Sequence, residues 1–441
     1  MASKMPVRDR SATRVGMISL GCTKNLVDSE VMLGLLKEKG YEITPHEKDA
    51  DILIVNTCAF IDAAKQESMD AIIQLACYVR RNKKIIVAGC MAQRYADQLE
   101  RKLKGKIHAL VGVGDFCSIA EACETVLAEK GFFKRVSEFP GYIYDHLTPR
   151  LRTTPPHFAY VKIAEGCDNC CSYCVIPQVR GKYRSRPIES IVIEVSSLAQ
   201  SGVKEIILIA QDTTYYGRDL GDGTDLSSLL RRLVQINGIQ WIRVLYWHPA
   251  HISDELLGLI AEEEKICPYI DIPVQHIHDE MLRKMGRPTT SDGIYNLIDR
   301  ICKIVPDATL RTSLIVGFPG ETERYFSDLM RFVEQIQFDH LGVFAYSAEE
   351  GTKAASLRDY VPESVKKERM DRIAQLHRRI AAEKRRRLIG QQMPVLVDSQ
   401  YPQATGRMQG QAPEIDDVVY IADGDVKIGE FVNVEITDTC E

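Results

Sequence analysis

Three cysteines lie close together near the middle of the sequence. Cys167, Cys171 and Cys174 form a C-x3-C-x2-C pattern that follows an apolar run. Cysteine thiolates are the ligands of iron–sulfur clusters, so this spacing suits three irons of a four-iron cluster and leaves the fourth iron without a protein ligand. An open metal position is where a substrate or cofactor binds. The alternatives are a zinc knuckle that lacks its fourth ligand and a chance cluster of cysteines. Cys170 also offers a second triplet with Cys167 and Cys174.

Three further cysteines are far apart in sequence but share one kind of position. Cys22, Cys58 and Cys90 each come just after a short apolar run. Ligand sites in parallel α/β sheets form beyond the carboxyl ends of the strands, so three such cysteines can converge on one point. The flanking Gly21 and Gly89 let the backbone approach a ligand closely. The alternative is three small buried residues at strand ends, because free cysteine often packs as a hydrophobe.

Polar and glycine-rich segments follow other apolar runs. Gln211-Asp212 and Gln275-His276 each end such a run, at the position that faces the catalytic mouth of a β/α barrel. Gly317-Phe-Pro-Gly320 predicts a tight strand-to-helix turn with free backbone N–H groups, which can hold a carboxylate or a sugar. An ordinary turn between a strand and a helix is the alternative.

Two other groups of potential metal ligands carry less information. His248 and His251 flank Pro249, which disfavours a metal pair on a regular helix. The remaining cysteines are isolated or lie on predicted helices, and we interpret them as structural: Cys77, Cys117, Cys123, Cys267, Cys302 and Cys440.

Composition limits the class of protein. The chain has 441 residues, 45% hydrophobic and 27% charged, with a net charge of −5, which excludes fibrous and disordered classes. The mild acidity disfavours bulk attraction to nucleic acid. No apolar stretch approaches the ~18 residues of a membrane span, and the first dozen residues lack the apolar core of a signal peptide. With 13 cysteines in a long chain, a disulfide framework fits poorly and metal or catalytic thiols fit better.

The first alternation of strands and helices must position the dispersed cysteines. Such alternation implies a parallel sheet with helices packed on it. The expected strands are Val15–Leu20, Ile52–Val55, Ile85–Ala88 and Ala109–Val113. The expected helices are Leu26–Lys39, Ile61–Arg80, Ala92–Lys104 and Ile119–Lys130. Residues 131–157 are rich in aromatics, Pro and Gly and predict a linker or a linking hairpin.

A second alternation carries the clustered cysteines. Its β/α units are fewer than the eight of a complete barrel, which predicts a partial, open one. The expected strands are Phe158–Ile163, Glu205–Ile209, Ile242–Tyr246, Tyr269–Pro273, Leu310–Val316 and Leu341–Tyr346. The expected helices are Ile188–Gln200, Leu226–Gln235, Asp254–Glu264, Ser291–Val305 and Glu323–Gln335.

The C-terminal part differs in both pattern and charge. Residues 361–388 predict a long basic helix with ten Lys or Arg against four Asp or Glu. Beyond it, Pro394–Asp398, Val418–Ile421 and Val432–Ile436 predict strands of a small, all-β, OB-like barrel. Residues 389–441 hold ten acidic side chains and only two basic ones, Arg407 and Lys427.

The sequence resembles the methylthiotransferases of the radical S-adenosylmethionine (SAM) superfamily along nearly its whole length. The matching segments are residues 19–30 (SLGCTKNLVDSE), 56–62 (NTCAFID), 164–177 (AEGCDNCCSYCVIP), 209–214 (IAQDTT), 271–276 (DIPVQH), 317–322 (GFPGET) and 342–347 (GVFAYS). The opening segment is most like the branch that modifies small ribosomal subunit protein twelve. Two residues depart from the pattern: Thr23 stands where that branch has Pro, and Cys170 where the family often has a polar residue.

The resemblance implies a fold and a set of cofactors. It implies an N-terminal Rossmann-like α/β methylthiotransferase domain at 13–130, a partial (β/α)6 radical SAM core at 153–385 and an all-β TRAM domain at 386–441. Cys167, Cys171 and Cys174 would hold the radical SAM 4Fe–4S cluster, and Cys22, Cys58 and Cys90 an auxiliary 4Fe–4S cluster. Tyr173, Gln211, Asp212, Gly317 and Gly320 are the candidate SAM contacts.

The resemblance also implies a reaction and partners. The reaction is methylthiolation of the β-carbon of an aspartate in that ribosomal protein, with two SAM equivalents, an electron donor such as flavodoxin or ferredoxin, and a sulfur source. A cytoplasmic, membrane-free location follows. The acidic C-terminal barrel should attract a basic ribosomal protein and repel RNA, which nominates Glu414, Asp416, Asp417, Asp423 and Asp425 as substrate contacts. The alternatives are methylthiolation of an adenosine in transfer RNA and a non-catalytic iron–sulfur or zinc scaffold.

Overall fold

A computed structural model of the chain describes residues 13–422 and 424–439, so Asp423 and Cys440 lie outside the described residues, as do the first dozen. The described chain forms two compact units. The first consists of the described part of Met1–Thr153 with Glu165–Asp168 and Cys174–Arg184. The second consists of Thr154–Ala164, Asn169–Tyr173 and the described part of Ser185–Glu441, so the C-terminal barrel shares a unit with the β/α core.

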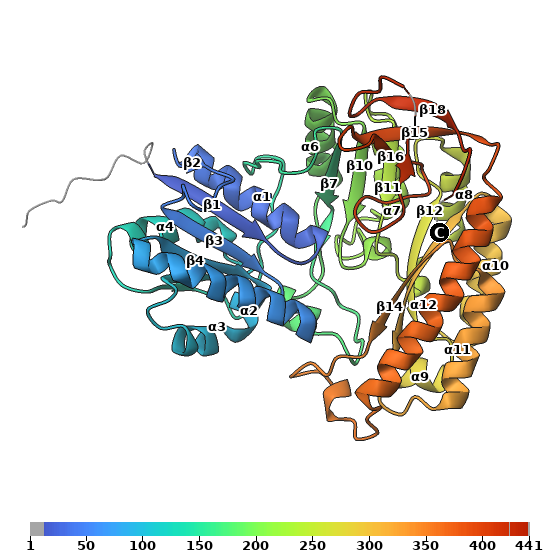
Figure 1. Cartoon of the computed structure of the whole chain (residues 1–441), viewed down its shortest axis with the longest axis horizontal. Coiled ribbons are helices and arrows are strands. Elements are labelled where there is room, and N and C mark those ends of the chain that lie inside the picture. Colours follow the sequence, from blue (N-terminus) through green and yellow to red (C-terminus); the bar gives the residue numbers. More distant parts are fainter. Residues whose placement is uncertain (1–12, 423, 440–441) are drawn as a thin grey trace, which may run out of the picture. The chain divides into compact units, whose positions relative to one another are not determined.

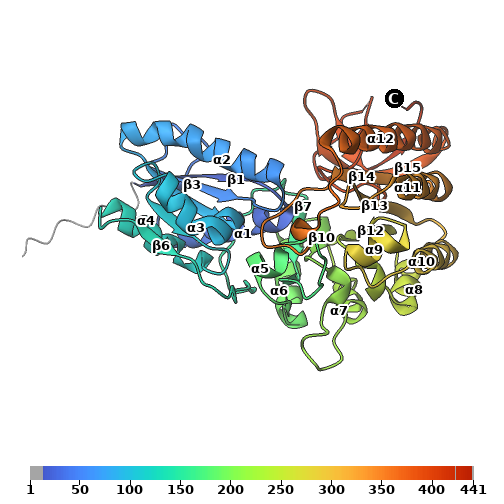
Figure 2. The same cartoon turned by 90° about the horizontal axis from the view of Figure 1, so that it is seen from below.

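The first unit is a parallel six-stranded sheet between helices (Figure 1). Its strand order is β2 (Glu42–Ile43), β1 (Arg14–Ser19), β3 (Ile52–Thr57), β4 (Lys84–Gly89), β5 (Ala109–Val111) and β6 (Phe133–Arg135). The helices are α1 (Thr23–Glu38), α2 (Asp62–Ala76), α3 (Cys90–Lys102) and α4 (Ile119–Leu127). Figure 2 shows α2 on the opposite side of the strands from α1. The continuous apolar run of β3 is wholly buried, as expected of a strand covered on both faces.

Two strands of this sheet were not predicted. The segment expected to be a linker or a hairpin contains β6, which pairs in parallel with β5. The short β2 pairs with β1. Both lie at the edges of the sheet, where few side chains are buried, so neither strand produces an apolar run in the sequence.

The core of the second unit is the expected partial barrel of alternating strands and helices. Its strands form two parallel sheets, β11-β10-β7 and β12-β13-β14. The strands are β7 (Phe158–Lys162), β10 (Glu205–Ile209), β11 (Trp241–Val244), β12 (Tyr269–Gln275), β13 (Thr309–Val316) and β14 (His340–Ala345). The helices are α6 (Ile188–Gln200), α7 (Leu226–Leu233), α8 (Asp254–Glu262), α9 (Asp279–Lys284), α10 (Ser291–Ile304) and α11 (Glu323–Ile336). The short α9, like α5 (Ile176–Arg180) of the first unit, was not predicted.

The C-terminal region confirms the expected long helix and small β-structure. Helix α12 (Glu363–Arg386) packs against α11 and β14. The antiparallel sheet that follows has the order β17 (Val419–Tyr420), β16 (Thr405–Arg407), β15 (Gln392–Ser399) and β18 (Phe431–Glu435). Its small core comprises Val395, Val397, Ile421 and Val426.

The C-terminal barrel is seated on the first residues of the β/α strands. Arg407 of β16 pairs with Glu205, the first residue of β10, at 2.7 Å, and both side chains are almost fully buried. Phe431 packs edge-on against Trp241, the first residue of β11, with ring centroids 4.7 Å apart. Tyr269, the first residue of β12, donates to Asp416 at 2.6 Å. These contacts place the barrel at the strand ends opposite to the predicted catalytic mouth.

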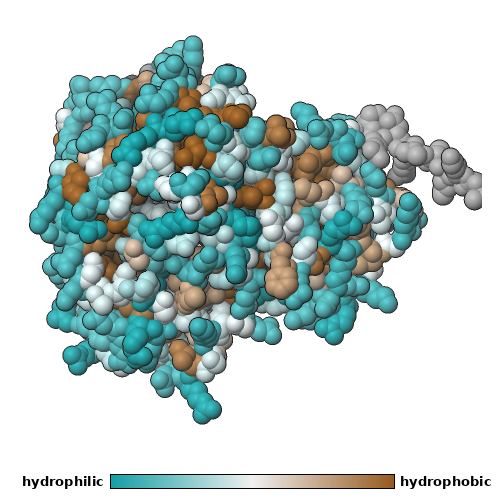
Figure 3. All heavy atoms as spheres, turned by 180° about the vertical axis from the view of Figure 1, so that it is seen from behind, coloured by the Kyte–Doolittle hydropathy of each residue, from teal (hydrophilic) through white to brown (hydrophobic). Residues whose placement is uncertain are grey.

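The face of the molecule drawn in Figure 3 is mainly hydrophilic. On the face drawn in Figure 3, teal side chains predominate and apolar ones occur in small separate patches. Among the helices of the described residues, none is both long and apolar enough to cross a membrane.

Candidate functional site

The structure brings together the three cysteines that are dispersed in the sequence. Cys22 follows β1, Cys58 follows β3, and Cys90 begins α3 after β4. Gly21 has φ +87°, and a Cβ added to it would lie 3.0 Å from the Sγ of Cys58. Only glycine allows this close approach, in which the backbone of the residue before Cys22 lies against the side chain of Cys58.

The three thiols influence one another electrostatically. Burial raises the pKa of Cys90 to about 12, and the negative charges of Cys22 and Cys58 add to this effect. Burial, together with Cys22, also raises the pKa of Cys58. Desolvation opposes ionisation of Cys22 as well, but Lys24, Arg180 and nearby backbone N–H groups outweigh it and lower its pKa. Three thiolates this close need a compensating cation, and the iron of a cluster supplies one. The donor set therefore fits a cluster with three cysteine ligands.

A buried arginine stands beside these thiols. Arg180, at the end of α5, donates to the Sγ of Cys90 at 3.6 Å and to the Oδ1 of Asn25 at 2.9 Å. It also pairs with Asp28 at 3.1 Å and with Glu165 at 2.9 Å. Its side chain is 2% exposed. Burial alone would lower the pKa of Arg180, but these acidic partners raise it, so the group stays charged.

Backbone hydrogen bonds hold the loop with the C-x3-C-x2-C pattern at Cys167 and at Ser172. In the first unit, the N–H of Cys167 donates to the carbonyl of Gly181 at 3.1 Å. In the second unit, the N–H of Ser172 donates to the carbonyl of Met285 at 2.8 Å. Arg287 there donates to the Sγ of Cys171 at 3.8 Å. Cys170 is exposed, whereas Cys171 is half-buried.

The carboxylate of Asp212 forms hydrogen bonds to several groups within the protein. One of its carboxylate oxygens accepts from the hydroxyl of Thr214 and the N–H of Tyr215, at 2.8 and 3.2 Å. The other accepts from Asn169 of the cysteine loop at 2.9 Å and bonds the Nδ1 of His251 at 2.8 Å. Asp212 therefore ties the loop to the carboxyl end of β10 and orients His251, where the sequence suggested a direct SAM contact.

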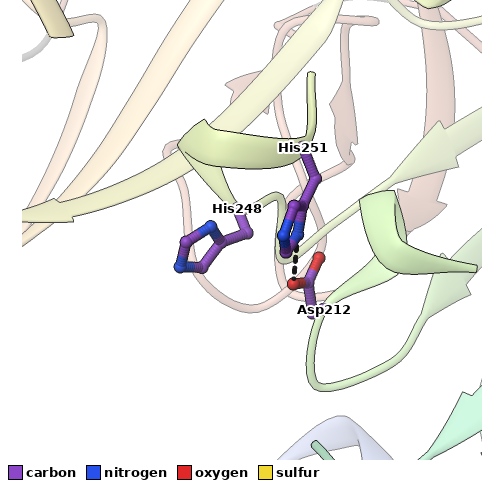
Figure 4. Close-up of side chains that lie close together, drawn as sticks. All are labelled: Asp212, His248 and His251. Atoms are coloured by element: carbon purple, nitrogen blue, oxygen red, sulfur yellow. Dashed lines mark hydrogen bonds and ion pairs between the residues drawn. The ribbon is translucent and has the colours of Figure 1, made fainter. Parts of the chain in front are cut away.

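His248 and His251 lie close together although no regular helix joins them. His248 precedes a short 3-10 turn and His251 is its last residue, and their ring centroids are 4.8 Å apart. Figure 4 shows the ring of His251 directed at Asp212 and the ring of His248 turned away from both. With Asp212 they could offer ligand atoms to a metal ion. The N–H of Ala250 donates to the Nδ1 of His248 at 3.3 Å, however, so the Nε2 of His248 carries the proton and is a donor.

The turn at Gly317–Gly320 differs from its prediction in one respect. Its backbone N–H groups were expected to be free, and this is wrong. The N–H of Gly317 donates to the carboxylate of Glu321, and the N–H of Gly320 donates to the carbonyl of Asp359 at 2.8 Å. Glu321 is itself fully buried and pairs with Arg369 at 2.8 Å. The N–H groups of these two glycines are therefore engaged in hydrogen bonds within the protein.

The other predicted cofactor contacts lie in the second unit. Tyr173 packs against a small buried cluster that includes Met281 and Phe318. Gln211 is half-buried at the end of β10. His276, after β12, is fully buried and contacts Glu321 at 3.3 Å, so it supports the glycine turn.

The acidic residues of the C-terminal barrel differ in their surroundings. Asp416 has a side chain only 1% exposed and lies against Arg311 and His340. It is therefore a contact between the barrel and the strand ends, which corrects its nomination as a surface residue that meets substrate. Asp417 is half exposed and pairs with Arg385, while Glu414 and Asp425 are exposed.

Sequence reasoning missed three residues of these sites: Asn169, Arg180 and Arg287. Asn169 lies inside the cysteine motif, and this position is a sequence signal for a role in the site. The two arginines lie outside any ligand motif, and their spacing carries no signal for a sulfur contact. Only the folded chain places them.

Comparison with known proteins agrees with this organisation. Family models match at residues 14–112 (Uncharacterized protein family UPF0004), 161–333 (Radical SAM superfamily) and 389–441 (TRAM domain). The ribosomal protein uS12 methylthiotransferase RimO of Pelobacter propionicus is 50% identical over 440 residues, which cover 97% of this chain and 96% of that protein. The protein of the same name from Geobacter sulfurreducens is 48% identical and covers 97% of both chains.

Solved structures share the fold at low sequence identity. The radical SAM methyltransferase TsrM from Kitasatospora setae superposes with a TM-score of 0.54 at 16% identity, over 75% of this chain and 72% of that one. The cobalamin-dependent radical SAM enzyme OxsB gives a TM-score of 0.52 at 11% identity, over 82% and 56%. The full-length identity to the curated relatives is what decides the family. The chain belongs to the ribosomal protein uS12 methylthiotransferases of the radical SAM superfamily.

Proposed function

We propose that this enzyme transfers a methylthio group to the β-carbon of an aspartate in ribosomal protein uS12, with SAM and two 4Fe–4S clusters as its cofactors. Full-length relatives of that name, about half identical to this chain, support the substrate. The observation that carries the chemistry is the convergence of Cys22, Cys58 and Cys90 on one edge of the sheet. A radical SAM enzyme with one cluster would not need this second thiol site.

The chain's own residues have separate tasks in this reaction. Cys167, Cys171 and Cys174 would hold the cluster that binds SAM, and the dispersed triplet would hold the auxiliary cluster. When bound, these groups supply the one-electron chemistry and the sulfur that ordinary acid–base side chains cannot provide at an unactivated carbon. Arg180 and Arg287 donate hydrogen bonds to Cys90 and Cys171, which stabilises negative charge on those sulfurs.

Hydrogen bonds within the protein reduce the number of residues that could contact SAM directly. Tyr173 and Gln211 remain the candidates for direct contact. Asp212 acts through the residues that it orients, and the N–H groups of Gly317 and Gly320 are engaged within the protein. An electron donor such as flavodoxin or ferredoxin, and a source of sulfur, complete the proposal, and the ribosomal substrate favours a cytoplasmic location.

The C-terminal barrel would favour a basic protein over RNA as substrate. Its exposed acids Glu414, Asp417 and Asp425 give one sign of charge to that surface. Complementary charge raises the association rate of a basic partner more than its final affinity. Changing these three acids to their amides should slow association with uS12 several-fold at low salt and less at high salt. Unchanged, salt-independent association would remove the charge argument.

Mass spectrometry of cellular substrates is the decisive test of the function. Ribosomal protein uS12 and transfer RNA would be compared from cells with and without this gene. The proposal expects loss of the methylthio mass from uS12 alone. Loss from transfer RNA instead would establish the rival activity. A colourless protein with zinc and no acid-labile sulfide, after anaerobic purification, would establish a scaffold.

A further inference from the structure

Two buried side chains near the cysteine loop each keep an N–H group with no hydrogen-bond partner among the described residues. They are the Nε2 of His248 and the Nε of Arg287. His248 is 5% exposed and Arg287 is 7% exposed. Buried polar groups in folded proteins are nearly always paired, so an orphaned donor calls for an explanation.

His248 is held as a neutral donor. The N–H of Ala250 occupies its Nδ1, so the remaining ring nitrogen carries the proton. Burial and the positive charge of Arg287 lower the pKa of His248 to about 3, which keeps the ring uncharged in the physiological range. Its free N–H can therefore bind an acceptor but cannot serve as the cation of an ion pair.

Arg287 supplies the positive charge that the neutral ring of His248 lacks. Its two terminal nitrogens donate to the Sγ of Cys171 and to the carbonyl of Pro273, at 3.8 and 2.8 Å. In the described part of the chain no carboxylate lies within ion-pair distance of it. Arg180 differs, because it pairs with both Glu165 and Asp28. A buried guanidinium without a carboxylate partner is costly unless a ligand brings one.

Both donors belong to one neighbourhood beside the loop. Asn169, between two of the loop's cysteines, bonds Asp212 at 2.9 Å, and Asp212 orients His251, whose ring lies next to His248. The charge of Arg287 reaches both His248 and Asp212. Asp212 and His248 follow the carboxyl ends of β10 and β11, and Arg287, which follows α9, reaches the carbonyl of Pro273 in β12. The carboxyl ends of the strands are where β/α barrels bind their substrates.

We propose that Arg287 and His248 hold the side-chain carboxylate of the target aspartate. The guanidinium provides charge and one N–H, and the imidazole provides a second N–H. Asp212 and His251 act as positioning residues for this site. The inference rests on the proposed function, since it takes an aspartate as the target. It adds a reason for choosing aspartate: the carboxylate is next to the carbon that reacts.

The methionyl carboxylate of SAM has the same chemistry. In the proposed function SAM would be held by the cluster of Cys167, Cys171 and Cys174, which would supply the partner for that carboxylate. The carboxylate of the target aspartate has no other partner of opposite charge assigned to it. The two sources are separated by measuring SAM and uS12 binding independently.

The experiment measures binding to the enzyme with both clusters loaded. The probes are isolated uS12, the same protein with asparagine in place of the target aspartate, and SAM. Wild-type enzyme should bind the aspartate form roughly tenfold to a hundredfold more tightly than the asparagine form, as expected of charge-assisted hydrogen bonds. Arg287→Gln and His248→Phe should each reduce this ratio towards one, and His248→Phe should do so while affinity for the asparagine form and for SAM stays unchanged.

Controls separate this role from a structural one. His248→Phe touches no cysteine, so it keeps the test valid if Arg287→Gln fails to retain its cluster. Arg186→Gln removes another buried arginine, one that pairs with Glu194, and should leave the ratio intact. Loss of SAM affinity with an intact ratio would assign the site to SAM and overturn the proposal, as would an intact ratio with unchanged SAM binding. If wild-type enzyme neither binds nor modifies uS12, the proposed function fails instead.

Discussion

The two cysteine triplets are built in opposite ways. One is a continuous loop, and its ligands can be read from local spacing. The other collects single residues from the ends of three strands. Each has a buried arginine that donates to a cysteine sulfur, but Arg180 is paired with two carboxylates and Arg287 with none among the described residues. In the dispersed site the positive charge of Arg180 is therefore neutralised by carboxylates of the protein. Beside the loop the positive charge of Arg287 remains available for a ligand.

The largest expected effect separates the two triplets. Changing Cys22, Cys58 and Cys90 together to Ala should lower the iron content by about half, because one of two four-iron clusters is lost. Methylthiolation should stop, while reductive cleavage of SAM should continue. Iron analysis and SAM-cleavage assays measure both effects. Changing the exposed Cys77, Cys117 and Cys302 to Ala is the control and should alter neither. Full iron content in the first variant would show that the dispersed site holds no cluster.

The second prediction resolves the ambiguity within the loop. Cys171→Ala should abolish SAM cleavage, because Cys171 is the half-buried cysteine that Arg287 contacts. Cys170→Ala should retain it, since Cys170 is exposed. Assays of SAM cleavage with a chemical reductant compare the two variants directly. The opposite result would assign Cys170 as the middle ligand.

The third prediction tests the difference between the arginines. Arg180→Gln leaves Glu165 and Asp28 buried without their counter-charge, which should cost about 3–5 kcal/mol of unfolding free energy. Arg287→Gln strands no carboxylate and should cost much less. Denaturant unfolding measures both, and Arg180→Lys should recover part of the loss. Equal losses for the two variants would mean that the pairing with carboxylates is not what distinguishes them.

The smallest expected effect concerns the close approach at Gly21. Gly21→Ala places a Cβ 3.0 Å from the Sγ of Cys58, so the auxiliary site should lose part of its iron. Gly105→Ala is a matched control, because Gly105 also has a positive φ but nothing lies within 4 Å of its Cβ position. Both variants should lose about 1–2 kcal/mol of stability, because a residue with a Cβ is disfavoured at positive φ. Only Gly21→Ala should release iron on dialysis, and equal release would exclude the steric cause.

The sequence predicted most of what is local in this molecule. Most strands of the first unit's sheet and of the β/α core follow from short apolar runs, and β10 was expected with the bounds that the structure shows. The short edge strands β2 and β6 were missed because they bury too little to leave a pattern. For the same reason α5 was missed, although it ends in Arg180.

The candidate site was predictable only in part. The positions of the six cysteines were expected from apolar runs and spacing, and their role as cluster ligands stays a prediction. Three features could not be foreseen. Arg180 reaches Cys90, Glu321 caps the N–H of Gly317, and Asp416 is buried under the strand ends. Each depends on a contact between residues far apart in the chain or on a local choice of partner that composition does not encode.

The seating of the C-terminal barrel has a consequence for synthesis. Glu205 is buried at the start of β10, and one of its two guanidinium partners is Arg407, near the end of the chain. Domains generally fold in order as the ribosome makes them. Here the β/α core emerges with one of its buried charges incompletely matched, and it reaches its final form only when the last segment has left the exit tunnel. A chain truncated before the C-terminal barrel would therefore have a β/α core in which Glu205 lacks one of its two arginine partners, and such a core should be less stable.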